Sequence, residues 1–268
     1  YRDITQFVSA ASDFSTVTKS ASLEFGYPIS EFQGLRFGLV VQKSDLIVNP
    51  GNSAPEAVNW VRNNGNPYTR LIENEFPDGG DPDTDPDIIV TPLFGTKFDT
   101  YELVTGWFFD SRNRAIFADR GMRHSVSLAV TAPGSEVDYY VFNYDYLQLV
   151  PIWRQWTVAM SAELAFGDAL GNNTTALPPY RQFFAGGPSS VRGYTESRLG
   201  PKDGFGNPYG GNMKVIGRTE LLFPVPQKWR ASTRISAFFD IGNVFSQGAG
   251  VDFVGIDGVT PVDYEFDY

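Results

Sequence analysis

The sequence predicts an all-β fold, an antiparallel transmembrane β-barrel of the outer-membrane type with about eight strands. In several stretches of about ten residues, bulky apolar or aromatic side chains alternate with charged or very small ones. Aromatic residues make up 15% of the 268 residues, yet no run approaches the roughly 18 to 20 apolar residues of a membrane helix. This combination is typical of a wall that has one apolar face and one polar face.

The expected strands follow one another along the chain with turn-forming residues between them. Residues 1–20 are polar, show no period and are expected to be a loop. The first strand is marked by Leu23 and Phe25, which alternate with the polar Ser22 and Glu24. By the same criterion the eight strands cover residues 21–27, 35–42, 101–110, 125–131, 140–146, 156–167, 214–223 and 234–242.

The lengths of the connections favour a barrel over a soluble β-sandwich, which would show the same alternation. The connections at one end are short or moderate, and those at the other end are long apart from a tight turn at 133–136. Outer-membrane barrels have short periplasmic turns and long outer loops. Residues 1–268 are therefore expected to form a single partial barrel domain, with long extracellular loops at 47–98 and 168–212.

The loop expected at 47–98 contains two local features. Residues 54–63 are expected to form a short helix, because Pro55 suits a first turn and Trp60 and Val61 share a face. An acidic run at 78–87 superficially resembles a calcium-binding loop. It lacks the glycine and the final glutamate that such a loop requires, so a solvated acidic loop is the better interpretation and no metal site is expected.

Composition excludes several classes of function. The net charge of -10 argues against nucleic acid as a partner, because binding to phosphate groups needs clustered Lys and Arg. The chain has no cysteine and one histidine, His124, whose parity places it on the apolar face. No GxSxG or HExxH motif occurs, so neither an enzyme nor a cofactor is expected.

A glycine-rich stretch surrounds Arg192 in the loop expected at 168–212. A buried guanidinium group without a partner is prohibitive, so a loop that folds inward requires a carboxylate for this arginine. Counting by two along the last two strands places Glu220 and Asp240 on the polar face. These carboxylates could receive Arg192, or they could pair with Arg218 and Arg234 across the wall. The residues alone leave both alternatives open.

Five sequence blocks in this region resemble the transmembrane barrel of the BamA family, the central subunit of the bacterial barrel assembly machinery. The blocks occur in the family's order. They are Gly186-Gly187 with Val191-Arg192-Gly193-Tyr194, Leu199-Gly200-Pro201-Lys202-Asp203, Gly206-Asn207-Pro208-Tyr209-Gly210-Gly211-Asn212, Glu220-Leu221-Leu222-Phe223-Pro224, and Phe239-Asp240-Ile241-Gly242-Asn243-Val244-Phe245.

The resemblance implies that the loop at 168–212 folds into the lumen and that its arginine contacts acidic residues of the inner wall. The implied loop-to-wall clasp comprises Val191, Arg192, Gly193, Tyr194, Glu220 and Asp240, and the loop backbone depends on Gly186, Gly187, Gly200 and Pro201.

The resemblance also implies a function without covalent chemistry, the folding and insertion of nascent outer-membrane β-barrel proteins. The implied partners are those nascent proteins, outer-membrane lipid, and accessory lipoproteins that bind through periplasmic POTRA domains. Barrels of the family have about sixteen strands. The chain is therefore expected to be an interior part of such a barrel, without the POTRA domains.

Two other functions remain as alternatives. A related transporter of the same superfamily, either a translocation and assembly barrel or a two-partner secretion protein, shares an arginine-glycine-aromatic loop. The blocks at 200–203 and 206–212 favour the BamA family over both. A passive porin has charged side chains in its lumen but has no need of an arginine clasp.

Overall fold

The protein was analysed as a computed structural model, which describes residues 2–7, 14–74, 89–202, 206–229, 233–246, 253–254 and 261–262. The strands are β1 (Arg2–Phe7), β2 (Phe14–Pro28), β3 (Gln33–Val48), β4 (Asn66–Asn74), β5 (Ile89–Asp110), β6 (Gly121–Thr131), β7 (Tyr139–Trp153), β8 (Trp156–Ala169), β9 (Met213–Leu222), β10 (Ser236–Phe245), β11 (Phe253–Val254) and β12 (Pro261–Val262). The helices are α1 (Pro55–Asn63) and the 3₁₀ turns η1 (Pro179–Arg181) and η2 (Gln227–Trp229).

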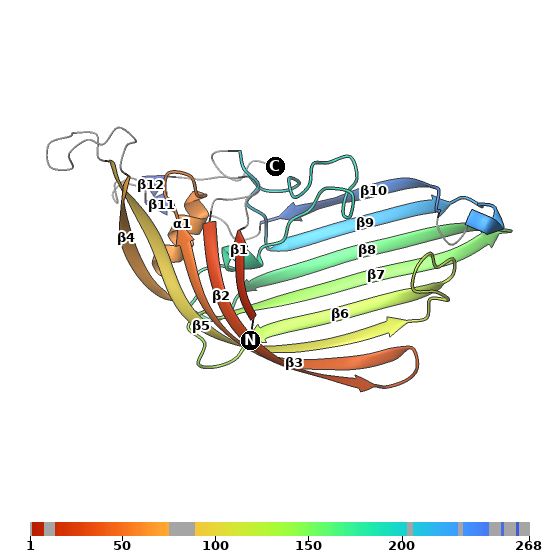
Figure 1. Cartoon of the computed structure of the whole chain (residues 1–268), viewed down its shortest axis with the longest axis horizontal. Helices are drawn as coiled ribbons and strands as arrows, with labels where there is room; N and C mark the ends of the chain where they lie inside the picture. Colours follow the sequence, from red (N-terminus) through yellow and green to blue (C-terminus); the bar gives the residue numbers. More distant parts are fainter. Residues whose placement is uncertain are drawn as a thin grey trace.

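One large antiparallel sheet dominates the fold. Its strands follow the order β1-β2-β3-β5-β6-β7-β8-β9-β10, and β4 pairs with β5 beside this path. Figure 1 shows these strands side by side as a curved sheet. Consecutive strands of this sheet pair with one another, except that β3 pairs with β5 and not with β4, so their backbone groups are hydrogen-bonded within the wall, as a hydrocarbon environment requires. No described helix is long and apolar enough to cross a membrane.

The outer face of the sheet is apolar and exposed. The register aligns Leu23 of β2, Leu39 of β3 and Leu103 of β5 as direct cross-strand neighbours. Each of these leucines is more than half exposed, at 56%, 51% and 51%. An aqueous protein rarely leaves such a continuous apolar band uncovered. The band is the face that a barrel presents to lipid.

The inner face of the sheet carries the charged and small residues of the period-two pattern. Register pairs Asp240 of β10 with Arg218 of β9, and pairs Phe238 with Glu220. On this face lies loop 170–212, the long connection between β8 and β9. It covers the part of the inner face from which the candidate site is built.

The strands extend further than their alternation indicates. Residues 14–20, expected to be loop, form the first half of β2 and pair with residues 42–48 of β3. The expected irregular loop at 47–98 likewise contains β4, which pairs with residues 89–97 of β5. The extended parts of β2 and β3 include Phe14, Leu46 and Val48, which are buried in a hydrophobic core and not exposed to lipid. The acidic run at 78–87 lies outside the described residues.

A hydrophobic core fills the end of the sheet where the long connections gather. Helix α1 forms as expected, and its buried Trp60 packs edge-on against Phe98 of β5, with ring centroids 5.7 Å apart. The indole Nε1 of Trp60 also donates a hydrogen bond of 2.9 Å to the carbonyl of Ala176. The core therefore fastens α1 to loop 170–212, so the two longest connections form one packed unit.

We predict that Leu39→Arg destabilises the folded barrel of the complete protein by about 2 to 4 kcal/mol, because an arginine on the lipid face is costly near the bilayer midplane. Denaturant unfolding in phospholipid vesicles measures this effect. The control is Ser127→Arg on the inner face, where Gly106 and Asn143 are the cross-strand neighbours. Equal losses for the two variants would show that the apolar band does not face lipid.

Candidate functional site: a clasp between loop and wall

Arg192 of loop 170–212 is bound to two carboxylates of the inner face. Its Nε and Nη2 donate to the two oxygens of Asp240, each at 2.7 Å, and its backbone N–H donates to the same carboxylate at 3.0 Å. Its Nη1 donates to Glu220 at 2.5 Å. A bidentate arginine–carboxylate pair is among the strongest and most directional of side-chain interactions. The guanidinium group is therefore held in one orientation.

An aromatic ring completes this site. The guanidinium carbon of Arg192 lies 3.7 Å from the centroid of the Phe238 ring, a close cation–π contact. Phe238 follows from the register, because it lies directly opposite Glu220 and two residues before Asp240 on the same strand face. The planar cation thus has a ring over one face and carboxylates along its edges. These four residues, Arg192, Glu220, Asp240 and Phe238, form the centre of the clasp, and from here on the name refers to them.

The two carboxylates of the clasp differ in burial. The side chain of Asp240 is 2% exposed, whereas those of Glu220 and Arg192 are 27% and 22% exposed. The hydrogen bonds of Asp240, followed by those of Glu220, raise the pKa of Arg192 above its ordinary value. Removal of Asp240 would leave the cation poorly compensated in a partly desolvated place. Asp240 is therefore the main partner of the arginine.

The backbone beside Arg192 needs glycine at specific places. Gly186 has φ 104°, and a Cβ there would lie 2.4 Å from the carbonyl oxygen of Thr195. Gly200 has φ 115°, and a Cβ there would lie 2.8 Å from the Cβ of Val244 on β10. Both positions combine a left-handed backbone with a close approach, which only glycine tolerates. These residues let the loop turn tightly against the wall.

The other expected loop residues lie around the same turn. Val191 is 2% exposed and packs with Ala185, Ile216 and Val244 in a small core between loop and wall. Tyr194 is 57% exposed, and its carbonyl accepts a 3.1 Å hydrogen bond from Gly187. Gly193 has φ 94°, and the carbonyl of Pro201 accepts a 3.0 Å bond from Tyr209. Val191 therefore anchors the turn while Tyr194 points away from the core.

The alternative pairing across the wall does not occur among the described residues. Arg218 donates to the carboxylate of Glu163 and to the backbone carbonyl of Ser189. Arg234 donates to the carbonyl of Ala118. Glu220 and Asp240 are thus engaged by the loop, and Arg218 itself adds a further bond to the loop at Ser189.

A second ionic anchor holds the same loop at a different part of the wall. Arg181 of η1 donates to the carboxylate of Glu102 on β5 and, at 3.1 Å, to the hydroxyl of Tyr139 on β7. The tyrosine hydroxyl also donates to Glu102. Glu102 is only 4% exposed, so its charge depends on these partners. Sequence reasoning missed this anchor because Arg181 and Glu102 are 79 positions apart and belong to no recognised block.

The arrangement is suited to holding a loop in place, because its charged groups are bound to one another. Among the described residues, no group of three or more His, Asp or Glu side chains is placed to hold a metal ion. His124 lies on the outer face within an aromatic cluster, where its Nδ1 is 3.0 Å from the hydroxyl of Tyr144.

Comparison with known proteins assigns the chain to a family. Residues 4–255 match the model of the Omp85 superfamily domain, which is nearly the whole chain. The chain belongs to the Omp85 superfamily. It is therefore an outer-membrane β-barrel protein of the kind found in Gram-negative bacteria, in a family whose members are not enzymes. The sequence-based prediction of an antiparallel outer-membrane barrel fold is confirmed by this match and by the structural relative described next.

Two BamA proteins illustrate the relationship. The chain is 30% identical over 237 residues to the outer membrane protein assembly factor BamA of Neisseria meningitidis serogroup B (strain ATCC BAA-335 / MC58). This match covers 87% of the chain and 27% of the relative. The crystal structure of BamA from Haemophilus ducreyi lacking POTRA domains 1-3 superposes with a TM-score of 0.72 at 25% identity. This structural match covers 91% of the present chain and 45% of the Haemophilus ducreyi chain. The Omp85 chain thus spans about a quarter of the curated relative's length.

We predict that Asp240→Asn releases the turn around Arg192 more than Glu220→Gln does, because Asp240 accepts three of the four hydrogen bonds from Arg192. Loss of the charge of a buried partner is expected to cost on the order of 3 kcal/mol. Limited proteolysis of the complete protein should cleave loop 170–212 fastest in Asp240→Asn. Glu196→Gln, an exposed change in the same loop, is the control. The reverse order of the two clasp variants would refute the assignment of Asp240 as main partner.

The second anchor gives a separate prediction. Arg181→Met should raise the rate of amide hydrogen exchange around η1, because Glu102 loses its cationic partner, while exchange near Arg192 stays slow. The measurement is exchange by mass spectrometry, with Arg198→Met as an exposed control in the same loop. Equal loss of protection at both places would mean that the two anchors act as one unit.

Proposed function

We propose that the chain is the barrel portion of a BamA-type assembly factor, which folds and inserts nascent β-barrel proteins into the outer membrane. The observation that carries the proposal is the clasp, in which Arg192 is bound to Glu220 and Asp240 within the sequence blocks typical of the BamA family. The 30% identity to a protein named as an assembly factor supports the same function.

The proposed role of the clasp is to hold loop 170–212 against the inner face while a client strand pairs with the edge of the sheet. In this proposal, a client strand pairs with an exposed edge by β-augmentation, which satisfies its backbone groups within hydrocarbon. Such pairing needs a wall that opens at one place and stays rigid elsewhere. The two anchors connect β5 and β7 to β9 and β10 through one loop, and so they brace the wall away from the edge.

The proposed partners follow from this activity. They are nascent outer-membrane β-barrel proteins, outer-membrane lipid in contact with the leucine band, and accessory lipoproteins that bind POTRA domains of the whole assembly factor. A transporter of the same superfamily would use a similar wall, but the blocks at 200–203 and 206–212 favour the assembly factor. A passive pore is disfavoured by the loop and the α1 core packed over the inner face.

A charge-swap rescue tests the proposed function. In the complete protein, Arg192→Glu alone should lower the level of newly assembled outer-membrane barrels in cells by at least ~tenfold, because it places three carboxylates together. The added change Asp240→Arg should restore part of the assembly by reversing the pair. Heat-modifiable gel mobility measures both the client barrels and the variant itself.

The controls separate function from stability. If the single variant is folded and abundant yet assembly stays normal, the clasp has no part in assembly and the proposed function loses its main support. A large steady conductance of the native protein in planar bilayers would instead favour a passive pore.

A further inference from the structure

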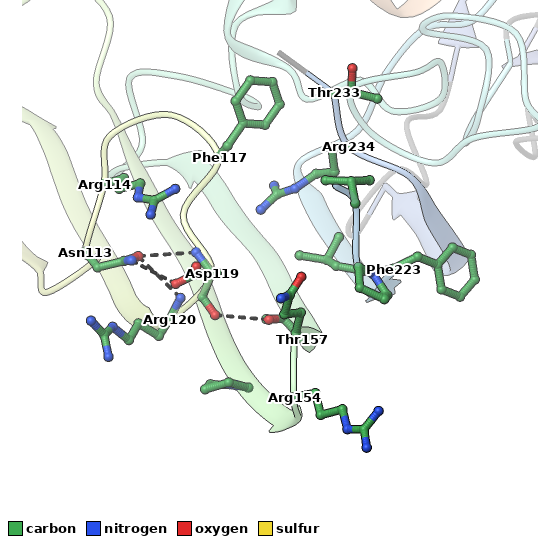
Figure 2. A pocket seen from close by; sticks show the side chains of 15 residues that line it. Asn113, Arg114, Phe117, Asp119, Arg120, Arg154, Thr157, Phe223, Thr233 and Arg234 are labelled. Carbon is green, nitrogen blue, oxygen red and sulfur yellow. Dashed lines mark hydrogen bonds between the residues drawn. The ribbon is translucent and has the colours of Figure 1, made fainter. Parts of the chain in front are cut away.

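A cavity of about 350 Å³ opens at the end of the sheet where the short connections gather. In outer-membrane barrels this is the periplasmic end. Its walls come from three separate connections: the loop between β5 and β6, the turn between β7 and β8, and the connection between β9 and β10 (Figure 2). Because residues far apart in the chain converge here, the cavity is a product of the fold and not of one loop.

Four arginines line this cavity, namely Arg114, Arg120, Arg154 and Arg234. Within the part of the chain that the structure describes, none of them forms a salt bridge. The lining contains a single carboxylate, that of Asp119, which accepts a 2.8 Å hydrogen bond from Asn113. A cluster of uncompensated cations is unexpected in a chain with a net charge of -10. Like charges gathered in a concave site focus a positive potential there.

The directions of the side chains define where a ligand would lie. Figure 2 shows the guanidinium groups of Arg114 and Arg234 pointing toward one another across the cavity, below the ring of Phe117. Arg120 and Arg154 extend outward at its rim. Two facing guanidinium groups repel each other unless an anion lies between them. The geometry therefore favours a carboxylate or similar anion at the centre, with further anionic groups near the rim.

Hydrogen bonds hold the cavity in shape, and one of them is donated by Arg234, whose guanidinium group also lies 5.8 Å from the ring centroid of Phe117. The carbonyl of Asp119 accepts a 3.2 Å bond from Thr157 on β8, and the carbonyl of Ala118 accepts a bond from Arg234. The backbone also adopts a rare conformation here, because Phe117 has a φ of 53°, whereas the φ of 48° at Arg154 is usual for the two-residue hairpin turn that it occupies. Left-handed backbone at residues other than glycine is costly and clusters at functional sites.

The position of the cavity favours a peptide over a lipid headgroup as its ligand. Thr157 and Leu222 line the cavity and are direct neighbours on the inner face of the wall. Trp156 belongs to the opposite parity and packs edge-on against Phe223, which lines the cavity at the strand end, with centroids 5.0 Å apart. Anionic lipid would approach from the outer side of this aromatic pair. The inner-face lining instead favours a ligand that comes from the aqueous mouth.

We propose that this cavity binds an acidic peptide segment of a periplasmic polypeptide. Its carboxylates would lie between Arg114 and Arg234 and along the outer arginines, and apolar side chains of the segment would contact Phe117, Pro151 and Pro224. This cavity adjoins the clasp, because Phe117 and Arg234 also line a neighbouring pocket with Arg192 and Glu220. The argument for the site does not depend on the assembly activity. It adds a binding function at the opposite end of the sheet from the α1 core.

The test measures binding of a fluorescein-labelled hexaglutamate peptide to the complete protein in nanodiscs, by fluorescence anisotropy. The native protein should bind the peptide saturably, and binding should weaken strongly at an ionic strength of about 1 M, where the screening length is about 3 Å. Arg114→Gln combined with Arg234→Gln should weaken binding by at least ~tenfold, equivalent to a loss of 1.4 kcal/mol. Arg114→Glu alone should also weaken it, and this change removes no described side-chain hydrogen bond.

A charge-matched control uses Arg62→Gln combined with Arg70→Gln, two exposed arginines at the other end of the sheet. This control should bind the peptide as the native protein does. The proposal is overturned if hexaglutamate does not bind saturably, or if the control and the cavity variants lose binding equally. It is also overturned if phosphatidylglycerol in the nanodisc or added glycerol 3-phosphate prevents peptide binding, since the cavity would then be a lipid phosphate site. Assembly activity plays no part in this measurement, so its failure and that of the proposed function are distinguishable.

Discussion

The guanidinium group of Arg192 must be neutralised on the inner face of the wall, and much of the surrounding structure satisfies this requirement. A cation in a partly desolvated place is tolerated only with close, well-oriented carboxylates. This requirement is met by one inward-facing acid on each of two neighbouring strands, by an aromatic ring beside them, and by a sharp turn in the loop. Gly186 and Gly200 then follow from the turn, because they allow the loop to reach those carboxylates. One charged side chain thus determines features of β9, β10 and the loop together.

The two faces of the sheet have different environments, lipid on the outer side and the loop on the inner side. The outer face carries an apolar band in which Leu23, Leu39 and Leu103 are direct neighbours, since lipid offers no specific partner. The inner face carries charged side chains, and two of its ionic sites bind the loop. Arg181 with Glu102 and Arg192 with Asp240 hold the loop to two different regions of the wall. Because both partners of each pair are in place, the desolvation of these charges is offset locally.

The sequence predicted the parts of the structure that have a periodic signal. Alternation located the central strands, and parity placed Glu220 and Asp240 on the face that receives Arg192. It failed for residues 14–20, where Phe14 packs into the core but the small polar Thr16 and Thr18 follow it on the same face, and for β4, which lies inside an expected loop. Phe238 was missed because an aromatic residue on the polar face breaks the pattern. The pair of Arg181 and Glu102 has no local signal at all, since it depends on how the sheet curves.

The two anchors also differ in whether the wall residues precede or follow the loop arginine in the sequence. The partners of Arg181 precede it, in β5 and β7, whereas Glu220 and Asp240 follow Arg192 by 28 and 48 positions. In a sheet that pairs its strands in chain order, the first anchor can close before β9 and β10 have joined the wall. The second can close only afterwards. Loop 170–212 would therefore be fastened in two stages, and closure of the clasp would mark the moment at which β10 has docked.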